Sequence, residues 1–317
     1  MATAFSPSNS VTTTTADKFI PDIWSDEIVA AYKKNLVLAN LVMKMNFKGK
    51  KGDTIHIPAP TRGSASAKAA EAAVTLIAAT ESEVTVSINK HYEYSRLIED
   101  IVEAQALNSL RNFYTSDAGY ALAKQVDTDL VQLGRSTNGG AGTNAYATGA
   151  FIGGDGTTAY VAANNNESAL TDAAIRRTIQ RLDDTDTPMD QRFFLIPPSS
   201  RNTLMGLARY TEQAFVGGTN STIRTGEIGN LYGIPVFVSS NCDTASGSNN
   251  ARVCLMGHRD AVVLVEQVAV RSQVQYKQEY LATLFTSDTL YGVQILRSAA
   301  SVSAAKSASM FALLVPA

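Results

Sequence analysis

The stretch LRNFYTSDAGYALAKQVDTDLVQLG, residues 110–134, carries a long regular pattern of apolar and aromatic side chains. They recur at every fourth position along one stripe, at Leu110, Tyr114, Ala118, Leu122, Val126 and Leu130. This spacing predicts a helix with one apolar face. The helical pattern begins near Leu97, and Asn108 or Ser109 is a point where it can divide into a short and a long helix. Gly134 occupies the position of a helix C-cap.

The predicted helix is long for a chain of this size. At a rise of 1.5 Å per residue, its later part alone spans about 40 Å. The radius of gyration expected for a compact chain of this length is about 20 Å. We therefore expect this helix to act as a spine, along which the other elements are arranged.

Length and composition fit a folded protein. The chain has 317 residues, of which 45% are hydrophobic and 18% charged. This length can bury a sizeable core and allows about two domains. The net charge is -2, from 27 basic and 29 acidic residues. The balance argues against a dedicated nucleic-acid binder, which would carry a basic excess, but leaves open a loose contact between one face and DNA.

The ends and the cysteines give information on location. The N-terminus, MATAFSPSNSVTTTTADKF, has no basic start and no apolar core, so it is not a signal peptide. No run of about 18 apolar residues predicts a membrane span. We therefore expect a protein made and used in the cytoplasm, or in something assembled there. Cys242 and Cys254 flank a polar loop, and reduced thiols are the favoured state, with a disulfide across a hairpin left open.

The first part of the chain predicts an arm and then a helix. Residues 1–20 are rich in Thr, Ser and Asn and cannot bury enough apolar area to offset the entropy of ordering. They are either a disordered tail or an arm that orders against a neighbour. Residues 21–42 have helical spacing of their apolar side chains.

A long hairpin is predicted next. In GDTIHIPAP, residues 52–60, Ile55 and Ile57 alternate, and in EVTVSINKHYEYS, residues 83–95, an alternation of apolar residues also begins. A two-stranded excursion of this size cannot easily stabilise itself in water. No later segment offers an obvious covering sheet, so we expect the covering surface to belong to another copy of the chain.

The remaining chain interleaves helices and short strands, which indicates an α+β or mixed α/β fold. We expect a helix capped at Ser168 or Thr171, and a further helix around Leu281 to Leu290. A Gly- and Asn-rich segment at 136–166 is expected to be an exposed loop or short hairpin. A short helix is expected at 199–208. Strands are expected at 192–198, 234–238, 251–257, 261–267, 268–278 and 291–298.

No catalytic, cofactor-binding or metal-binding residues are predicted. His56, His91 and His258 are far apart and lack metal-ligand spacing, so each is expected to be a surface or structural histidine. The acidic stretch 183–191 lacks the glycine and closing glutamate of a calcium loop. The segment 49–54 lacks the spacer of a phosphate loop, and the sequence has no nucleophile elbow. We therefore expect no enzyme and no cofactor.

Basic residues gather around the predicted hairpin. One hypothesis is a solvated edge whose charges prevent strand pairing. The other is contact with complementary charges on a neighbouring subunit. Under the second hypothesis the contact candidates are Lys50, Lys51, Arg62, Lys68 and Glu71.

The order of these elements resembles that of the major capsid (coat) proteins of tailed bacteriophages, with the Hong Kong 97-like fold. The resemblance runs from about Pro21 to Val315 and rests on the co-linear order of several stretches. They are YSRLIEDIVEAQALNSL and ALAKQVDTDLVQLG after the hairpin, RFFLIPPSSRNTLM, GEIGNLYGIPVFVSSN at 226–241, and LYGVQILRS.

The resemblance implies an α+β fold with four parts. These are an N-terminal arm and short helix at 1–46, an extended hairpin (the E-loop) at 47–95, a peripheral domain at 96–184 and 267–317, and an axial domain at 185–266. The Gly/Asn-rich segment 136–166 would be an insertion in the peripheral domain. In the axial domain, Gly229 and Gly233 would let the backbone turn tightly around Leu231 and Tyr232, before a strand at 234–238.

The implied function is self-assembly into the icosahedral capsid shell of a virion, enclosing double-stranded DNA and assembled in the host cytoplasm. The expected partners are the chain itself in hexamers and pentamers, scaffolding and portal proteins, cement or decoration proteins, and DNA without sequence specificity, with no membrane. Only a short arm precedes Pro21, which implies a mature form or a separate scaffolding protein, and no cross-linking residues can be matched. The alternatives are an encapsulin-like nanocompartment shell, a tail or neck component, and a small-ligand enzyme.

Overall fold

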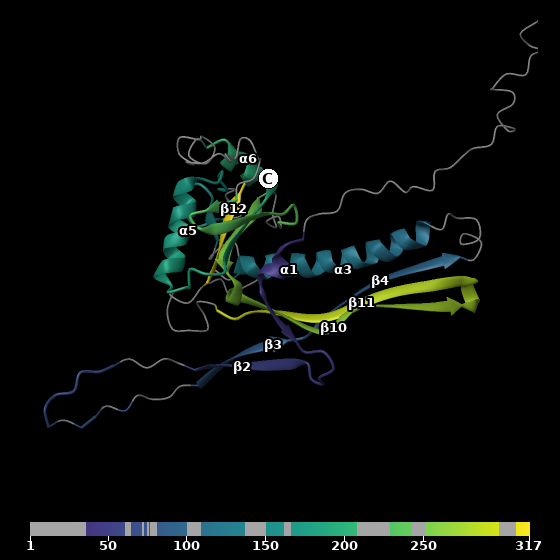
Figure 1. The fold of residues 1–317 in the computed structure, drawn as a ribbon, viewed down its shortest axis with the longest axis horizontal. Helices are drawn as coiled ribbons and strands as arrows, with labels where there is room; N and C mark the ends of the chain where they lie inside the picture. Colours follow the sequence, from purple (N-terminus) through teal and green to yellow (C-terminus); the bar gives the residue numbers. More distant parts are fainter. Residues whose placement is uncertain are drawn as a thin grey trace, which may run out of the picture.

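The structure is a computed structural model of the chain (Figure 1). It describes residues 36–60, 65–71, 73–74, 76, 81–99, 109–136, 150–161, 166–207, 229–242, 251–297 and 309–317. The expected arm at 1–20 lies outside the described residues. Of the helix expected at 21–42, residues 36–42 are described, and they contain one short helix, α1 (Leu38–Leu41).

The spine helix is confirmed as α3 (Ser109–Ser136). Leu122, Leu130 and Val131 are fully buried along one side. Gly134 lies inside the helix, so its expected role as a C-cap is wrong. A Cβ atom at this position would lie 2.9 Å from Cδ1 of Leu255, so the glycine lets α3 approach a sheet closely.

The larger sheet has six strands in the order β5-β12-β9-β6-β8-β7. The strands are β5 (Ala150–Ile152), β12 (Met310–Val315), β9 (Arg252–His258), β6 (Arg192–Ile196), β8 (Ile234–Val238) and β7 (Asn230–Leu231). The β6–β8 and β5–β12 pairs are parallel and the others antiparallel. This mixture of helices and strands confirms the expected α+β class.

Successive side chains of this sheet point into two different cores. Phe193 and Leu195 of β6 pack in the core that contains α3, whereas Phe194 and Ile196 pack in the core beneath α5 (Asp172–Asp184). Leu204 of α6 (Pro198–Met205) joins the second core. Both faces are therefore covered, which explains why the strand sequences are continuously apolar. Figure 1 shows α5, α6 and β12 together at one end of the molecule, from which α3 extends along the other sheet.

Two local expectations for this part are confirmed. The helix α5 has Thr171 as its N-cap, whose hydroxyl accepts a hydrogen bond of 3.3 Å from the backbone N–H of Ala174. The strands β7 and β8 form a hairpin in which Leu231 pairs with Ile234. Its two turn residues, Tyr232 and Gly233, have φ values of 51° and 82°, as a tight primed hairpin turn requires.

The second sheet has four strands in the order β1-β10-β11-β4. The strands are β1 (Met43–Asn46), β10 (Val262–Lys277), β11 (Ala282–Ile295) and β4 (Lys90–Glu99). Short 3-10 helices, Arg259–Ala261 and Gln278–Tyr280, precede β10 and β11. The two strands expected at 261–267 and 268–278 are a single strand, β10.

Two helix expectations in this sheet are wrong. The segment around Leu281 to Leu290 belongs to β11, where the buried Phe285 and Ser287 alternate with the less buried Leu284 and Thr286. Its apolar spacing fits a helix as well, but pairing with a strand on each side decides for the extended form. Leu97 lies in β4, so the helical pattern does not begin there.

The expected hairpin is confirmed as β2 (Thr54–Pro60) paired with β3 (Glu81–Ser87). Its base is covered by the chain itself, because Val86 and Ile88 pack against Val263 and Val265 of β10. The expectation that only another copy covers the hairpin is therefore wrong for its base. Figure 1 shows the hairpin extending in the direction opposite to the far end of β10 and β11, the end at which β10 turns into β11.

Strand pairing groups the chain differently from the boundaries expected from the sequence. The boundary at 266/267 falls inside β10, and the hairpin range 47–95 includes part of β4, which pairs with β11. The strands β5 and β12, expected in the peripheral domain, join the sheet of β6 and β9. Within the expected insertion at 136–166, Phe151 pairs with Ala159 in a short hairpin, one of the two expected forms, and Ala150 and Tyr160 are fully buried, so this part is not an exposed loop.

Candidate assembly surfaces

The charged contact candidates fall into two separate groups. Lys50 and Lys51 lie exposed in the turn between β1 and β2, and Lys68 and Glu71 lie exposed in the segment between β2 and β3. The strand β2 alone separates the groups by about 20 Å. The structure therefore does not bring the two groups together. Arg62 lies outside the described residues.

The basic turn is tied to β10. The side-chain amide of Gln267 donates hydrogen bonds of 3.0 Å to the carbonyl oxygens of Lys50 and Gly52. The Lys50 ammonium lies 5.6 Å from the centre of the Phe47 ring. These contacts fix the base of the hairpin on the sheet and leave the Lys51 side chain in solvent.

The segment between β2 and β3 exposes apolar side chains that the sequence analysis did not single out. Val74 is 69% exposed and Leu76 is 89% exposed. Single exposed apolar residues are common on protein surfaces, whereas a group of neighbouring ones marks a contact surface. The surrounding alanines made this segment resemble an ordinary loop in the sequence, so only its exposure in the structure reveals it.

Further exposed apolar side chains lie at the far end of the four-stranded sheet, where β10 turns into β11. They lie on both faces, because Val274 pairs through Phe285 with Arg96, the neighbour of Leu97 on β4. Val270 and Val274 of β10 are each about half exposed, at 51% and 52%, and Leu97 of β4 is 46% exposed. Leu281, next to the turn between β10 and β11, is 66% exposed. In the sequence Val270 and Val274 have the alternation of a strand, and Leu97 and Leu281 were assigned to helices, so the exposure of these side chains was not expected.

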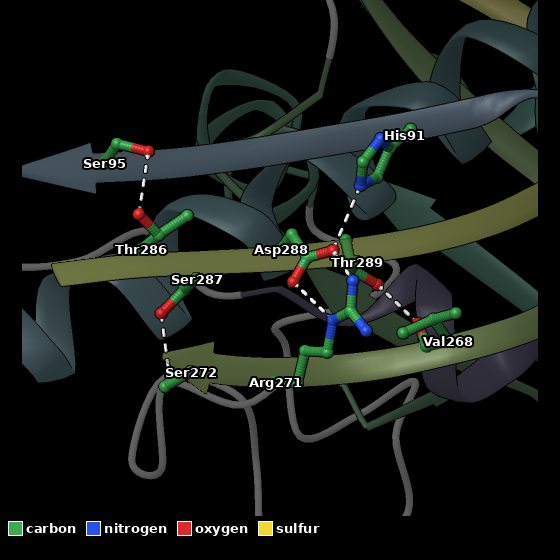
Figure 2. A network of polar contacts seen from close by, with 9 residues as sticks. All are labelled: His91, Ser95, Val268, Arg271, Ser272, Thr286, Ser287, Asp288 and Thr289. Carbon is green, nitrogen blue, oxygen red and sulfur yellow. Dashed lines mark hydrogen bonds and ion pairs between the residues drawn. The ribbon is translucent and has the colours of Figure 1, made fainter. Parts of the chain in front are cut away.

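Polar side chains connect the strands of this far end (Figure 2). Arg271 of β10 donates two hydrogen bonds, of 2.7 and 2.8 Å, to the carboxylate of Asp288 on β11. Nε2 of His91 on β4 lies 3.0 Å from the same carboxylate. Arg271, and to a smaller extent His91, lowers the pKa of Asp288 to about 2. One charged group thus bridges three strands.

Hydrogen bonds of small hydroxyl side chains also connect the strands of this sheet (Figure 2). The hydroxyls of Ser272 and Ser287 lie 3.0 Å apart, and the Thr289 hydroxyl donates a 3.1 Å hydrogen bond to the carbonyl oxygen of Val268. These bonds fix the strand register without a large apolar contact. The far end is therefore held in shape by its own strands and contributes little to a core.

Two buried carboxylates hold the spine helix in place. Asp129 is 4% exposed and lies 3.0 Å from the Lys90 ammonium, and it accepts a 2.7 Å hydrogen bond from the Tyr291 hydroxyl. Asp127 accepts a 2.9 Å hydrogen bond from the backbone N–H of Leu38, at the start of α1. Burial raises the pKa of Asp127. The helix is thereby fixed to both the four-stranded sheet and the start of the described chain.

The histidines and cysteines have structural surroundings. His56 lies 3.0 Å from Glu83, and both side chains are more than half exposed. The ring of His258 is buried and accepts a 3.2 Å hydrogen bond from the N–H of Asp260. Cys242 and Cys254 are free and buried, and burial raises the pKa of Cys254 to about 12.

A cavity with an uncharged lining is present in the described part of the chain. Within the described ranges, no three His, Cys, Asp or Glu side chains group to hold a metal ion. A cavity of about 230 Å³ lies between the start of α6 and the end of β12, and its lining includes Ser199, Asn202 and Val315. No acidic, basic or histidine side chain lines it. In the described part of the chain, no helix has the length and apolar character needed to cross a membrane.

Comparison with solved structures identifies the fold. A chain from Mycobacterium phage Che8 aligns with a TM-score of 0.72 and 21% identity, covering 93% of this chain and 97% of the other. The capsid of cyanophage P-SCSP1u gives a TM-score of 0.73 and 20% identity over 99% of both chains. The capsid asymmetric unit of cyanophage Pam1 gives 0.69 and 13% identity over 98% of both chains. The fold is thus that of tailed-phage capsid subunits, as the sequence predicted.

Sequence comparison identifies the family. No curated protein matches this sequence. The model of the phage capsid family matches residues 17–304, which is most of the chain. Together with the fold, this match confirms the predicted structural role in a virion shell. The chain belongs to the phage capsid family, as a major capsid protein.

Proposed function

We propose that many copies of this chain form hexamers and pentamers that tile an icosahedral head around double-stranded DNA, with each hairpin lying on a neighbouring copy. The observation that carries this proposal is the division of the hairpin into two parts. Its base is buried through Val86 and Ile88, whereas Val74 and Leu76 farther out are exposed. A buried base fixes the orientation of the hairpin on its own subunit, and an exposed apolar outer part fits a contact with a neighbouring subunit.

The positions of the exposed surfaces support contacts in which one surface of a subunit meets a different surface of its neighbour. The hairpin and the far end of the four-stranded sheet extend in opposite directions (Figure 1). Two different surfaces that meet head to tail generate closed rings when the rotation between copies closes. Such rings are the hexamers and pentamers of the proposal. Lys68 and Glu71 lie on the outer part of the hairpin, and Lys50 and Lys51 lie at its base. We therefore propose that the two pairs contact different neighbouring subunits.

The charge of the chain supports a loose contact with DNA. A net charge of -2 supplies no basic excess for strong phosphate binding. We propose that the packaged DNA is held mainly by enclosure. Scaffolding, portal and cement proteins would be separate chains, and assembly would take place in the host cytoplasm.

Sheet membership supports revised domain boundaries. We propose that the E-loop comprises residues 47–88, and that the peripheral domain is formed by α3 with β1, β4, β10 and β11. The axial domain would contain the six-stranded sheet with α5 and α6. In this division, each proposed domain has its own sheet.

The decisive test replaces residues 61–80, which join β2 to β3, with a short Gly-Ser linker. We expect a soluble subunit with an unchanged melting temperature that forms no shells in electron micrographs. A control replaces the same residues with a Gly-Ser sequence of equal length. The short linker removes both the length and the apolar side chains of the hairpin, whereas the control removes only the side chains. Normal particles from both variants would contradict the neighbour-contact role of the hairpin.

The contents of particles distinguish the encapsulin-like alternative. Shells isolated from infected cells should contain nuclease-protected double-stranded DNA. A tightly bound enzyme in place of DNA would instead favour a nanocompartment. The family match does not favour the small-ligand enzyme or the tail component.

A further inference from the structure

The helix α5 carries three arginines, and in the described part of the chain only the first has a carboxylate partner. Nε of Arg176 lies 2.9 Å from the carboxylate of Asp172. Arg177 donates a hydrogen bond of 2.8 Å to the side-chain oxygen of Gln180, which is uncharged. No carboxylate of the described residues lies within ion-pair distance of Arg177 or Arg181. Two positive charges are therefore left without a carboxylate in direct contact.

Each of these two arginines also has a buried N–H group without an acceptor. Nε of Arg177 and Nη1 of Arg181 are screened from solvent, and neither has a hydrogen-bond partner among the described residues. The Arg181 guanidinium carbon lies 3.3 Å from the centre of the Phe151 ring, so the ring covers one face of this group. A guanidinium that stacks on an aromatic ring can still donate hydrogen bonds in its own plane. Buried donors of a charged group are costly when they stay unpaired, so this pair calls for an acceptor.

The two guanidinium groups also repel each other. Side chains four residues apart on a helix are neighbours, and like charges at this spacing destabilise the helix. Burial, and after it the charge of Arg177, lowers the pKa of Arg181 to about 10, although Asp155 attracts it. The carboxylate of Asp155 is held in its own turn, where it accepts a 2.6 Å hydrogen bond from the Thr158 hydroxyl. A negative group bound between the arginines would offset this repulsion.

A phosphate group has the charge and the acceptors that these arginines need. Guanidinium groups bind phosphate through paired N–H···O bonds, and a phosphate offers several strong acceptor oxygens. One phosphate can therefore accept hydrogen bonds from Arg177 and Arg181 together. Both side chains are half-buried, so the ligand must be small where it touches them. The helix α5 covers the face of the six-stranded sheet opposite to α3, so these arginines lie apart from the hairpin and from β10 (Figure 1).

We propose that Arg177 and Arg181 form a binding site for a phosphate group, in which the ring of Phe151 supports the Arg181 guanidinium. The phosphate oxygens accept hydrogen bonds from Nε of Arg177 and Nη1 of Arg181, which small rotations of the two half-buried side chains bring into reach. Free inorganic phosphate and the phosphates of a DNA backbone share this chemistry, and the experiment separates them. The site goes beyond the proposed function and does not depend on it, so either can fail alone.

Thermal unfolding of the full-length subunit in the presence of sodium phosphate tests the proposal. The reference is sodium chloride at the same ionic strength, and a short DNA duplex is added in a separate series. A ligand that binds only the folded chain, at about ten times its dissociation constant, raises the ratio of folded to unfolded chain about eleven-fold. We expect the melting temperature of the wild type to rise with phosphate until the site is saturated. A rise with the duplex as well would identify the DNA backbone as a second source of the phosphate group.

Two variants remove donors of the site, and a third is the matched control. Arg177→Gln and Arg181→Lys should each weaken phosphate binding about five-fold or more, because a forked guanidinium donor is lost. Arg177→Gln should also raise the melting temperature without phosphate, since it removes the repulsion between like charges. Arg176→Gln makes the same change at the neighbouring position, where the arginine is already paired with Asp172. We expect the phosphate response of this control to match that of the wild type.

A wild-type chain whose melting temperature responds equally to phosphate and to chloride would overturn the site. An equal loss of response in Arg176→Gln would also overturn it, because the effect would then come from overall charge. If Arg177→Gln abolishes shells while the wild type shows no phosphate response, the pair contacts a carboxylate of a neighbouring copy instead, and the proposal is wrong.

Discussion

The six-stranded sheet and the far half of the four-stranded sheet are both built from paired strands, yet the composition and the surroundings of these strands differ. Every residue of β6 and β12 is buried. In β10, by contrast, every residue from Val270 to Tyr276 is exposed. The first sheet has helices on both faces, whereas α3 is the main element that the described chain places on the second.

The difference shows that stability and assembly reside in different parts of the chain. The six-stranded sheet buries its apolar residues without help and should be stable in an isolated subunit. The far half of β10 and the outer hairpin hold their shape through strand pairing and polar links, and leave apolar side chains for neighbours. Mutations can therefore separate subunit stability from shell formation.

The largest effect is expected in the six-stranded sheet. Phe194 is 1% exposed and packs in the core under α5. Phe194→Ala removes most of a fully buried ring, which costs about 3–5 kcal/mol. We expect this variant to unfold at much lower denaturant concentration in chemical denaturation. The matched control Val274→Ala, in β10, should change the free energy of unfolding by less than about 0.5 kcal/mol; a comparable loss there would contradict the contrast.

The junction of the two regions should show the next largest effect. Asp129→Ala leaves the Lys90 ammonium and the Tyr291 hydroxyl without their shared partner. We expect a loss of about 2–3 kcal/mol, because one charge of a largely buried pair stays unpaired. Tyr291→Phe, which removes only the hydroxyl, should cost about 1 kcal/mol. Equal losses for both variants, measured by denaturation, would show that the charge pair contributes nothing.

The crossing of the hairpin over β11 should show a moderate effect on stability and a larger one on assembly. A Cβ at Gly292 would lie 2.5 Å from the carbonyl oxygen of Ser87, which is backbone and cannot rotate away. Gly292→Ala should therefore cost about 1–3 kcal/mol and shift the hairpin. Gly119 has no atom within 4 Å of such a Cβ. Shell yield in electron micrographs should fall for Gly292→Ala and stay normal for Gly119→Ala.

The polar link on the exposed sheet should show the smallest effect. Arg271 holds the pKa of Asp288 at about 2, below the usual value of about 4. Because the folded-state pKa is lowered, this carboxylate stabilises the fold above about pH 4, and the contribution is lost as the pH falls toward about 2. Asp288→Asn should flatten the dependence of melting temperature on pH in this window. An unchanged slope would show that the pair adds nothing measurable, as many exposed pairs do.

Periodicity predicted the elements whose burial is decided locally. The stripe of α3, the Thr171 cap of α5 and the Tyr232–Gly233 turn all follow from short-range patterns. The residues of β11 have apolar spacing compatible with either a helix or a strand. Only their partners β10 and β4, distant in sequence, decide the outcome.

The candidate surfaces were less predictable from the sequence. Lys50, Lys51, Lys68 and Glu71 were identified by charge, and their exposure agrees with a surface role without testing contact. Val74 and Leu76 lie in a segment that resembles an ordinary loop in the sequence, and Val270 and Val274 have the pattern of a half-buried strand. Their exposure depends on which faces the rest of the chain leaves uncovered, and local sequence does not determine that.

Hydrogen exchange measured on the isolated subunit and on the assembled shell tests the central claim most directly. We expect the amides of β6 and β12 to exchange slowly in both states. The amides of the outer hairpin and of β10 from Ala269 to Lys277 should exchange rapidly in the subunit and slowly in the shell. Equal protection of these segments in both states would contradict the account, because it would mean that they need no neighbours.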